Sequence, residues 1–187
     1  MNMEKKNQLS IKSIVAIGIG AALFFVLGRF VAIPSPIPNT TINIQYAILA
    51  IFGVIYGPVV GFLTGFIGHT LIDLSWGGTW WSWIIASAVF GLIIGLTKNM
   101  IKVGTTKLGK KQIITFNVVQ VIGHLVAWAV VAPGLDILIY NEPLEKLFVQ
   151  TTSAVIFNSV ATGIVGTIIL VSYAKTKTNA GSLNKED

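Results

Sequence analysis

Hydrophobic positions along the chain group into segments of membrane-spanning length. Nearly uncharged stretches cover residues 13–33, 43–56, a third segment opening at Pro58, 79–96, 112–131 and 146–173. About 20 apolar residues in a helix cross a hydrocarbon core about 30 Å thick. We therefore predict an all-α membrane protein, with one domain of six transmembrane helices at 13–173, an N-terminal tail at 1–12 and a C-terminal tail at 174–187.

Between these segments the sequence predicts short connections. Three prolines within 34–41 cannot continue a helix, so this stretch is expected to form a semi-rigid outer loop. Residues 132–145 contain Pro133 and Pro143 and are expected to form a second outer loop. Gly57, Gly61, Gly65 and Gly68 give the third segment a smooth face that allows close helix packing.

Composition supports the membrane assignment. Of the 187 residues, 53% are hydrophobic and 11% are charged, whereas about 25% of a typical soluble domain is charged. Six helices leave no room for a separate soluble catalytic domain. The absence of cysteine excludes disulfides and thiolate metal sites.

The placement of charge predicts the topology. All thirteen Lys and Arg residues except Arg29 and Lys146 lie in the N-terminal tail, the C-terminal tail or the loop 98–111. Six spans put these three segments on one side, which the positive-inside rule identifies as the cytoplasm. The acids between the tails fall on the opposite side: Asp73, Asp136, Glu142 and Glu145. Both termini are therefore expected to be cytoplasmic, and the net charge of +6 reflects topology and not a nucleic-acid partner.

A polar stripe runs along the fifth segment. Its members, three or four residues apart on one helical face, are Asn117, Gln120, His124 and Trp128. Such groups either form hydrogen bonds between helices or face a ligand. The His and Trp favour a binding face, with Asn158 and Gln150 of the sixth segment opposite.

Aromatic residues gather at the outer start of the fourth segment. Four tryptophans lie within eight residues: Trp76, Trp80, Trp81 and Trp83. An interfacial belt explains one or two of them, and stacking on a flat ligand is the alternative for the others. His69 and Asp73 are four residues apart, but no third ligand is evident, so no metal site is predicted. The candidate substrate-binding residues are His124, Trp128, Asn158, Trp80, Trp81, Asp73, His69 and Gln150, with no catalytic residue and no cofactor.

Small residues mark one side of the first segment. Ala16 with Gly20 and Gly18 with Ala22 form two small-xxx-small pairs, which allow another backbone to approach closely. The partner is either the protein's own bundle or another subunit.

Taken together, the short spans, the basic ends and the stretch YGPVVGFLTGFIGHTLIDL resemble the substrate-binding S components of energy-coupling factor (ECF) vitamin transporters. The nearest motif match is Gly57-Pro58-x-x-Gly61 with the later Asp73, and the resemblance covers about residues 10–175. It implies a non-enzymatic subunit of a bacterial plasma membrane that captures a vitamin or precursor in an outward-facing pocket, formed mainly by helices 4–6 under a lid from the first outer loop. The first helices would dock a transmembrane T component, which two ATPase subunits drive.

Nucleotide binding by the chain itself is not expected. Residues 104–111 resemble a P-loop, but Lys111 stands where Ser or Thr must reach magnesium. A pocket with indole, amide and imidazole groups suits a flat heteroaromatic such as hydroxymethylpyrimidine, pyridoxine or riboflavin. The alternatives are a stand-alone secondary transporter or channel, which would need intramembrane carboxylates where only Asp73 is near a span, and a membrane enzyme, which would need more than His69 and His124.

Overall fold

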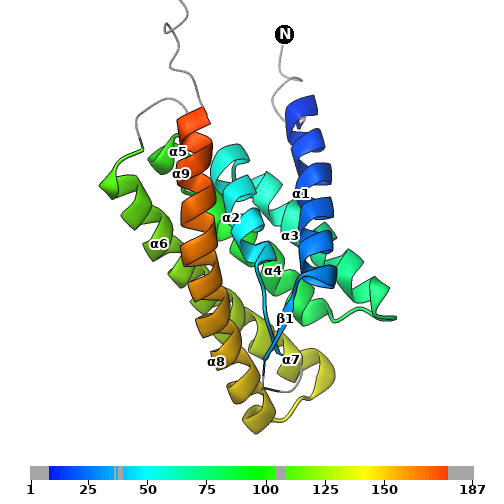
Figure 1. The fold of residues 1–187 in the computed structure, drawn as a ribbon. Coiled ribbons are helices and arrows are strands. Elements are labelled where there is room, and N and C mark those ends of the chain that lie inside the picture. Colours follow the sequence, from blue (N-terminus) through cyan, green and yellow to red (C-terminus); the bar gives the residue numbers. More distant parts are fainter. Residues whose placement is uncertain (1–8, 36, 38–39, 104–107, 177–187) are drawn as a thin grey trace, which may run out of the picture.

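The chain folds into a bundle whose long helices lie side by side and extend from one end of the molecule to the other (Figure 1). The computed structural model describes residues 9–35, 37, 40–103 and 108–176. In order, the elements are α1 (Ile11–Phe30), β1 (Ile33–Pro34), β2 (Thr41–Ile42), α2 (Gln45–Tyr56), α3 (Pro58–Ser75), α4 (Trp81–Gly95), α5 (Lys98–Ile101), α6 (Lys110–Leu125), η1 (Val126–Val131), α7 (Ala132–Tyr140), α8 (Leu144–Ala161), η2 (Thr162–Gly166) and α9 (Thr167–Thr176).

Five helical stretches in the described part of the chain are long and apolar enough to cross a membrane, and α2 is a shorter apolar helix beside them. The five are 11–30, 58–75, 81–101, 110–140 and 144–176. This confirms the prediction of an all-α, multi-pass membrane protein. The start of α1 and the end of α9 lie at the same end of the bundle, as six passes require (Figure 1).

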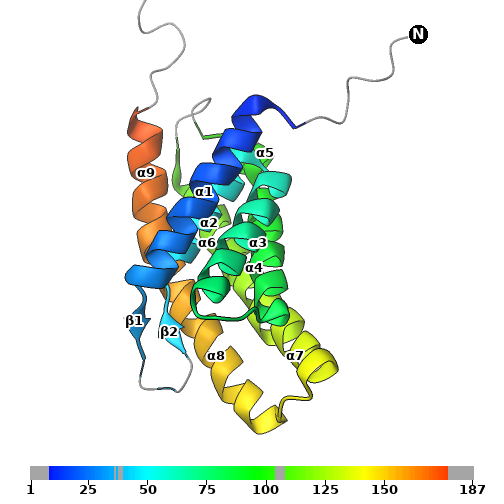
Figure 2. The ribbon, with the colours of Figure 1, turned by 90° about the vertical axis from the view of Figure 1, so that its right-hand side faces the viewer.

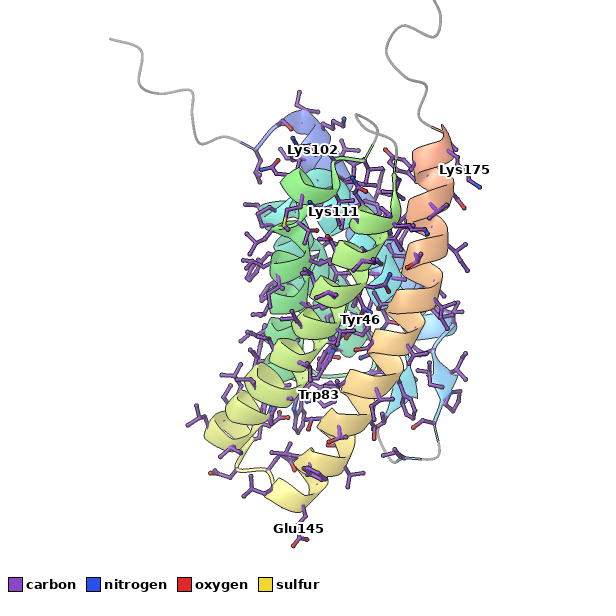
Figure 3. All side chains as sticks on the ribbon, turned by 90° about the vertical axis from the view of Figure 1, so that its left-hand side faces the viewer. Tyr46, Trp83, Lys102, Lys111, Glu145 and Lys175 are labelled. Atoms are coloured by element: carbon purple, nitrogen blue, oxygen red, sulfur yellow. The ribbon has the colours of Figure 1, made fainter. Side chains whose placement is uncertain are left out.

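Charge separates the two ends of the bundle. Lys102, Lys111 and Lys175 lie at one end, which we call the lysine end, and Glu145 lies at the other (Figure 3). The opposite end also carries β1 and β2 (Figure 2), and we call it the hairpin end. Residues 1–8 and 177–187 of the tails and 104–107 of the basic loop lie outside the described residues. The assignment of the lysine end to the cytoplasm stays a prediction.

The second pass is helical over only half its length. The 12 residues of α2 span about 18 Å, which is too short to cross a bilayer core. The chain leading into α2 is β2, which pairs antiparallel with β1 through Ile33↔Ile42 and Pro34↔Thr41. The predicted outer loop 34–41 is therefore partly a β-hairpin. Near the hairpin end a two-stranded ribbon, and not a helix, precedes α2 in the bundle (Figure 1).

The fifth pass is longer than predicted. Residues 132–140, expected in a loop, continue the helix as α7, so one helical stretch runs over 31 residues from Lys110 to Tyr140. A proline cannot donate the usual backbone hydrogen bond and its ring crowds the preceding turn. Here the turn before Pro133 widens into the π-helix η1, which accommodates the ring without ending the helix. Asn141, with φ of +52°, ends α7, and α8 begins just after Pro143.

Glycines bring α3 and α4 into backbone contact. A Cβ atom placed on Gly61 would overlap the carbonyl of Gly91, and one on Gly65 would lie 2.6 Å from the carbonyl oxygen of Ser87. The predicted smooth face of α3 is thus confirmed at these two positions. This contact fixes α3, which carries His69 and Asp73, against α4, which begins in the tryptophan cluster.

Candidate functional site

Two adjoining cavities lie toward the hairpin end. The first has a volume of about 380 Å³ and is lined from α3, α4, α7 and α8. The second, about 440 Å³, lies among α1, the hairpin, the start of α2 and α3, and is also bordered by Trp83 of α4 and Ala154 of α8. Both sizes fall within the range typical of small-molecule sites, about 300–1,000 Å³. The residues that border both cavities are His69, Asp73 and Trp83.

A buried carboxylate holds the wall of the first cavity. Asp136, from α7, is 1% exposed. It accepts hydrogen bonds from Trp80 Nε1 at 2.7 Å and Trp83 Nε1 at 2.9 Å, and from the hydroxyl of Ser82. The Trp80 ring also stacks on Tyr140, with 4.3 Å between ring centroids. Asp136 therefore orients both indoles and joins the start of α4 to α7.

A second carboxylate lies where the cavities meet. Asp73 Oδ2 accepts the backbone N–H of Trp80 at 2.8 Å, and Oδ1 lies 3.5 Å from His69 Nε2. The other ring nitrogen of His69 is 2.6 Å from Ser87 Oγ, which also contacts the hydroxyl of Tyr46 at 3.0 Å. Each carboxylate thus has protein donors, while Asp73 borders both cavities. Among the described residues, no three His, Asp or Glu side chains are grouped closely enough to hold a metal ion.

Other polar groups border the cavities further out. In the first, Lys146 Nζ donates to Glu142 at 2.7 Å, and Gln150 is a further polar residue of the lining. In the second, the Arg29 guanidinium lies 3.8 Å from the centroid of the Trp76 ring.

The polar stripe of the fifth pass lies in the core and not in either cavity. His124 and Trp128 are fully buried, and Trp128 Nε1 donates to His124 Nδ1 at 3.0 Å. His124 Nε2 lies 3.1 Å from Thr162 Oγ1 of η2. Deeper along the same face, Gln120 donates to the Ser159 carbonyl and Asn117 to the Thr167 hydroxyl. The bonds of His124, Gln120 and Asn117 to Thr162, Ser159 and Thr167 join the fifth pass to the sixth, as the interhelical alternative expected.

Trp128 nevertheless supports the cavity wall. Its ring centroid lies 5.1 Å from that of Trp83 and 5.4 Å from that of Tyr46 (Figure 3 labels Tyr46 and Trp83). Because Trp83 borders both cavities, Trp128 lies directly behind the lining. Its predicted contact with a ligand, like that of His124, stays a prediction.

The structure thus gathers half of the predicted binding residues. His69, Asp73, Trp80 and Gln150 line the first cavity, whereas the other four do not: Trp81, His124, Trp128 and Asn158. Sequence reasoning did not select Trp83, Asp136, Glu142 or Lys146. Asp136 was missed because its segment was assigned to a loop. As part of α7 it contradicts the expectation that Asp73 is the one acid near a span.

The small residues of α1 divide between two faces. Ala16 and Gly20 are buried, and a Cβ on Gly20 would lie 2.8 Å from the Phe52 ring. Gly18 and Ala22 are exposed, and nothing lies within 4 Å of a Cβ placed on Gly18. One pair therefore packs inside the bundle and the other faces outward.

Comparison with known proteins gives a consistent picture. The sequence model of the family described as "ECF-type riboflavin transporter, S component" matches residues 8–175. A protein of Streptococcus gordonii named UPF0397 protein is 51% identical over 178 residues, which cover 95% of each chain. Proteins of the same name from Lactobacillus helveticus (51% identical; 98% of this chain and 100% of the relative) and Clostridium perfringens (52%; 97% and 99%) are similar over nearly their full lengths.

Proposed function

Because the chain belongs to the family of ECF-type riboflavin transporter S components, we propose that it is the substrate-capturing subunit of an ECF-type importer in a bacterial plasma membrane. The observation that carries this proposal is the pair of adjoining cavities at the hairpin end, opposite the lysines. If the lysine end is cytoplasmic, the cavities face the outside, where a nutrient must be captured. The family is one of transporter components and not of enzymes.

The ligand of this site is a vitamin or vitamin precursor with a flat heteroaromatic ring. Trp80 and Trp83 supply aromatic surface, and His69, Asp73 and Gln150 supply hydrogen-bonding groups within the same lining. Such a combination of apolar walls and a few polar groups is typical of small-molecule sites. Hydroxymethylpyrimidine, pyridoxine and riboflavin all have this character, and riboflavin is the substrate that the family's description names.

Energy for uptake comes from partner subunits: a transmembrane T component and two ATPases. The outward face of α1, with Gly18 and Ala22, is the docking surface for the T component. Without bulky side chains at these positions, a partner helix can approach to backbone contact. Ala16 and Gly20 are occupied by the chain's own packing.

Gly18→Leu and Ala22→Leu test this assignment. We expect each variant to lose co-purification with the T and ATPase subunits, because the added atoms separate the two backbones. The isolated variants should keep their melting temperature and their ligand affinity, since both positions are exposed. Ile14→Leu is the matched control, because it changes an exposed α1 side chain without adding volume. Co-expression, affinity purification and vitamin uptake assays provide the readouts.

Full recovery of the complex with either variant would remove α1 as the docking surface. Uptake by the chain alone, without ATPases, would instead favour the alternative of a stand-alone transporter.

A further inference from the structure

The cavity lining carries more negative than positive charge. Three carboxylates line the first cavity: Asp73, Asp136 and Glu142. Its one lysine, Lys146, is paired with Glu142. Within the described part of the chain, no lysine or arginine forms an ion pair with Asp73 or Asp136. The second cavity adds Arg29, whose guanidinium lies against Trp76.

The two carboxylates without a cation differ in what they offer a ligand. Asp136 is 1% exposed, and each of its oxygens already accepts an indole N–H. Asp73 borders both cavities, and among the described residues the polar contact of its Oδ1 is the 3.5 Å approach to His69 Nε2. A charge in a low-dielectric site is costly without a partner of opposite sign. Asp73 is therefore the group that a bound cation would neutralise.

An independent feature also calls for a hydrogen-bond donor. Gln45 is 5% exposed and borders the second cavity, and its buried side-chain oxygen has no hydrogen-bond partner among the described residues. An unpaired buried acceptor carries a desolvation penalty that a ligand donor can remove. The lining thus has unused acceptors in both cavities.

Aromatic side chains complete the pattern. Trp83 borders both cavities together with Asp73 and His69, and Trp80 adds a second indole to the first. Indole is the strongest aromatic partner for a cation, and aromatic side chains recognise quaternary ammonium ligands in this way. In the first cavity a phosphate group would be repelled by the carboxylates, and the lysine of this lining, Lys146, is already paired with Glu142.

We propose that the ligand is an unphosphorylated cation, either a permanently charged nitrogen heteroaromatic or an aromatic ring that bears an aminomethyl group, and that its positive charge lies against Asp73 and beside Trp83. This inference rests on the proposed function and narrows its ligand class. It favours cations of the thiamine and pyridoxamine type over pyridoxine and the neutral flavin.

Matched ligand pairs test the charge. The full-length protein, purified in detergent, is titrated calorimetrically with pyridoxamine and pyridoxine, which differ in an ammonium against a hydroxyl group, and with thiamine and riboflavin as a cationic and a neutral vitamin. We expect at least one cation to bind at least tenfold more tightly than either neutral compound. The phosphorylated form of the bound cation should bind at least tenfold more weakly than the cation itself.

Asp73→Asn tests the residue. Asparagine keeps an oxygen that can accept the Trp80 N–H, so the fold should persist, and the melting temperature without ligand checks this. We expect the affinity for the cation to fall at least tenfold and the affinity for neutral compounds to change less than threefold. Asp73→Glu, which keeps the charge, should retain the preference for the cation. Glu145→Gln makes the same charge change at an exposed position outside both linings and should leave affinity unchanged.

Failure of both cations to bind would overturn the inference, whatever the neutral compounds do. Tighter binding of riboflavin or pyridoxine would also overturn it, while leaving the proposed function intact. An unchanged cation affinity in Asp73→Asn would refute the assignment of that residue. Loss of the T-component complex is measured separately and bears only on the proposed function.

Discussion

His124 is held on all sides by the protein. Both ring nitrogens contact side chains of neighbouring turns or helices, and its ring stacks on Phe90 with 4.0 Å between centroids. Replacing it would leave Trp128 without its acceptor and open a void beside Phe90. At this residue, stability and binding can be separated by experiment.

His124→Ala should lower the free energy of unfolding by about 2–4 kcal/mol, from the void and the unpaired indole N–H. Because His124 lines neither cavity, the structure-based expectation is a change in ligand affinity of less than threefold, whereas the ligand contact predicted from the sequence would require a loss of about tenfold or more. Thermal unfolding and calorimetric titration of the same preparation measure both quantities. Leu125→Ala, at the exposed neighbouring position, is the control and should shift the melting temperature little. A tenfold loss of affinity at an unchanged melting temperature would show that His124 contacts the ligand.

Among the elements, α3 and α4 have the tightest contact. Gly61 and Gly91 face one another so closely that each lies where the other's Cβ would be. No side chain stands between them to move aside, so any added atom must displace a helix.

Gly61→Ala should therefore lower the free energy of unfolding by about 1–3 kcal/mol, the usual cost of overpacking. Gly78→Ala is the matched control, because nothing lies within 4 Å of a Cβ at that position. Thermal unfolding in detergent provides the comparison. Equal melting temperatures for the two variants would show that α3 and α4 can separate without cost.

The helical passes could be predicted from the sequence because span length and hydrophobicity determine them directly. The continuation of the fifth helix through Pro133 could not be predicted from the sequence. Two effects oppose one another there: proline tends to end a helix, whereas unpaired backbone groups are very costly in lipid. In the bundle the cost of unpaired backbone outweighs the effect of the proline, and the wider turn of η1 accommodates the Pro133 ring. The error carried over to Asp136, whose place in the site depends on α7 being helical.

For the whole molecule, the sequence also left open which polar face lines a cavity. Helical spacing placed His124 and Trp128 on one face of the fifth pass. The same spacing placed His69 and Asp73 on one face of the third pass, so spacing alone could not distinguish the two faces. The second cavity lies beside the hairpin and the start of the short α2, and the first lies among α3, α4, α7 and α8, so the position of open space depends on how all six passes pack. For this reason only half of the predicted binding residues line the first cavity: His69, Asp73, Trp80 and Gln150.

Orientation in the membrane is tested with single-cysteine variants, which are unambiguous because the natural chain has no cysteine. We expect Glu145→Cys to react with a membrane-impermeant maleimide in intact cells and Thr176→Cys to react only after lysis. The positive-inside rule predicts this result from the lysine end. Labelling of Thr176→Cys from outside would invert the topology and place the cavities toward the cytoplasm.

Because α2 is helical over only half the pass, the two ends of the bundle are expected to differ in how easily they deform. Beside the helical part of α2, the glycine contacts between α3 and α4 leave no free space, so a displacement of one helix must move the next. Toward the hairpin end, the two-stranded ribbon pairs through Ile33↔Ile42 and Pro34↔Thr41 and borders the second cavity on one side, so it is less enclosed than the helices at the lysine end. For the proposed ligand, we therefore expect entry and exit to displace the ribbon while the helices at the lysine end keep their mutual positions.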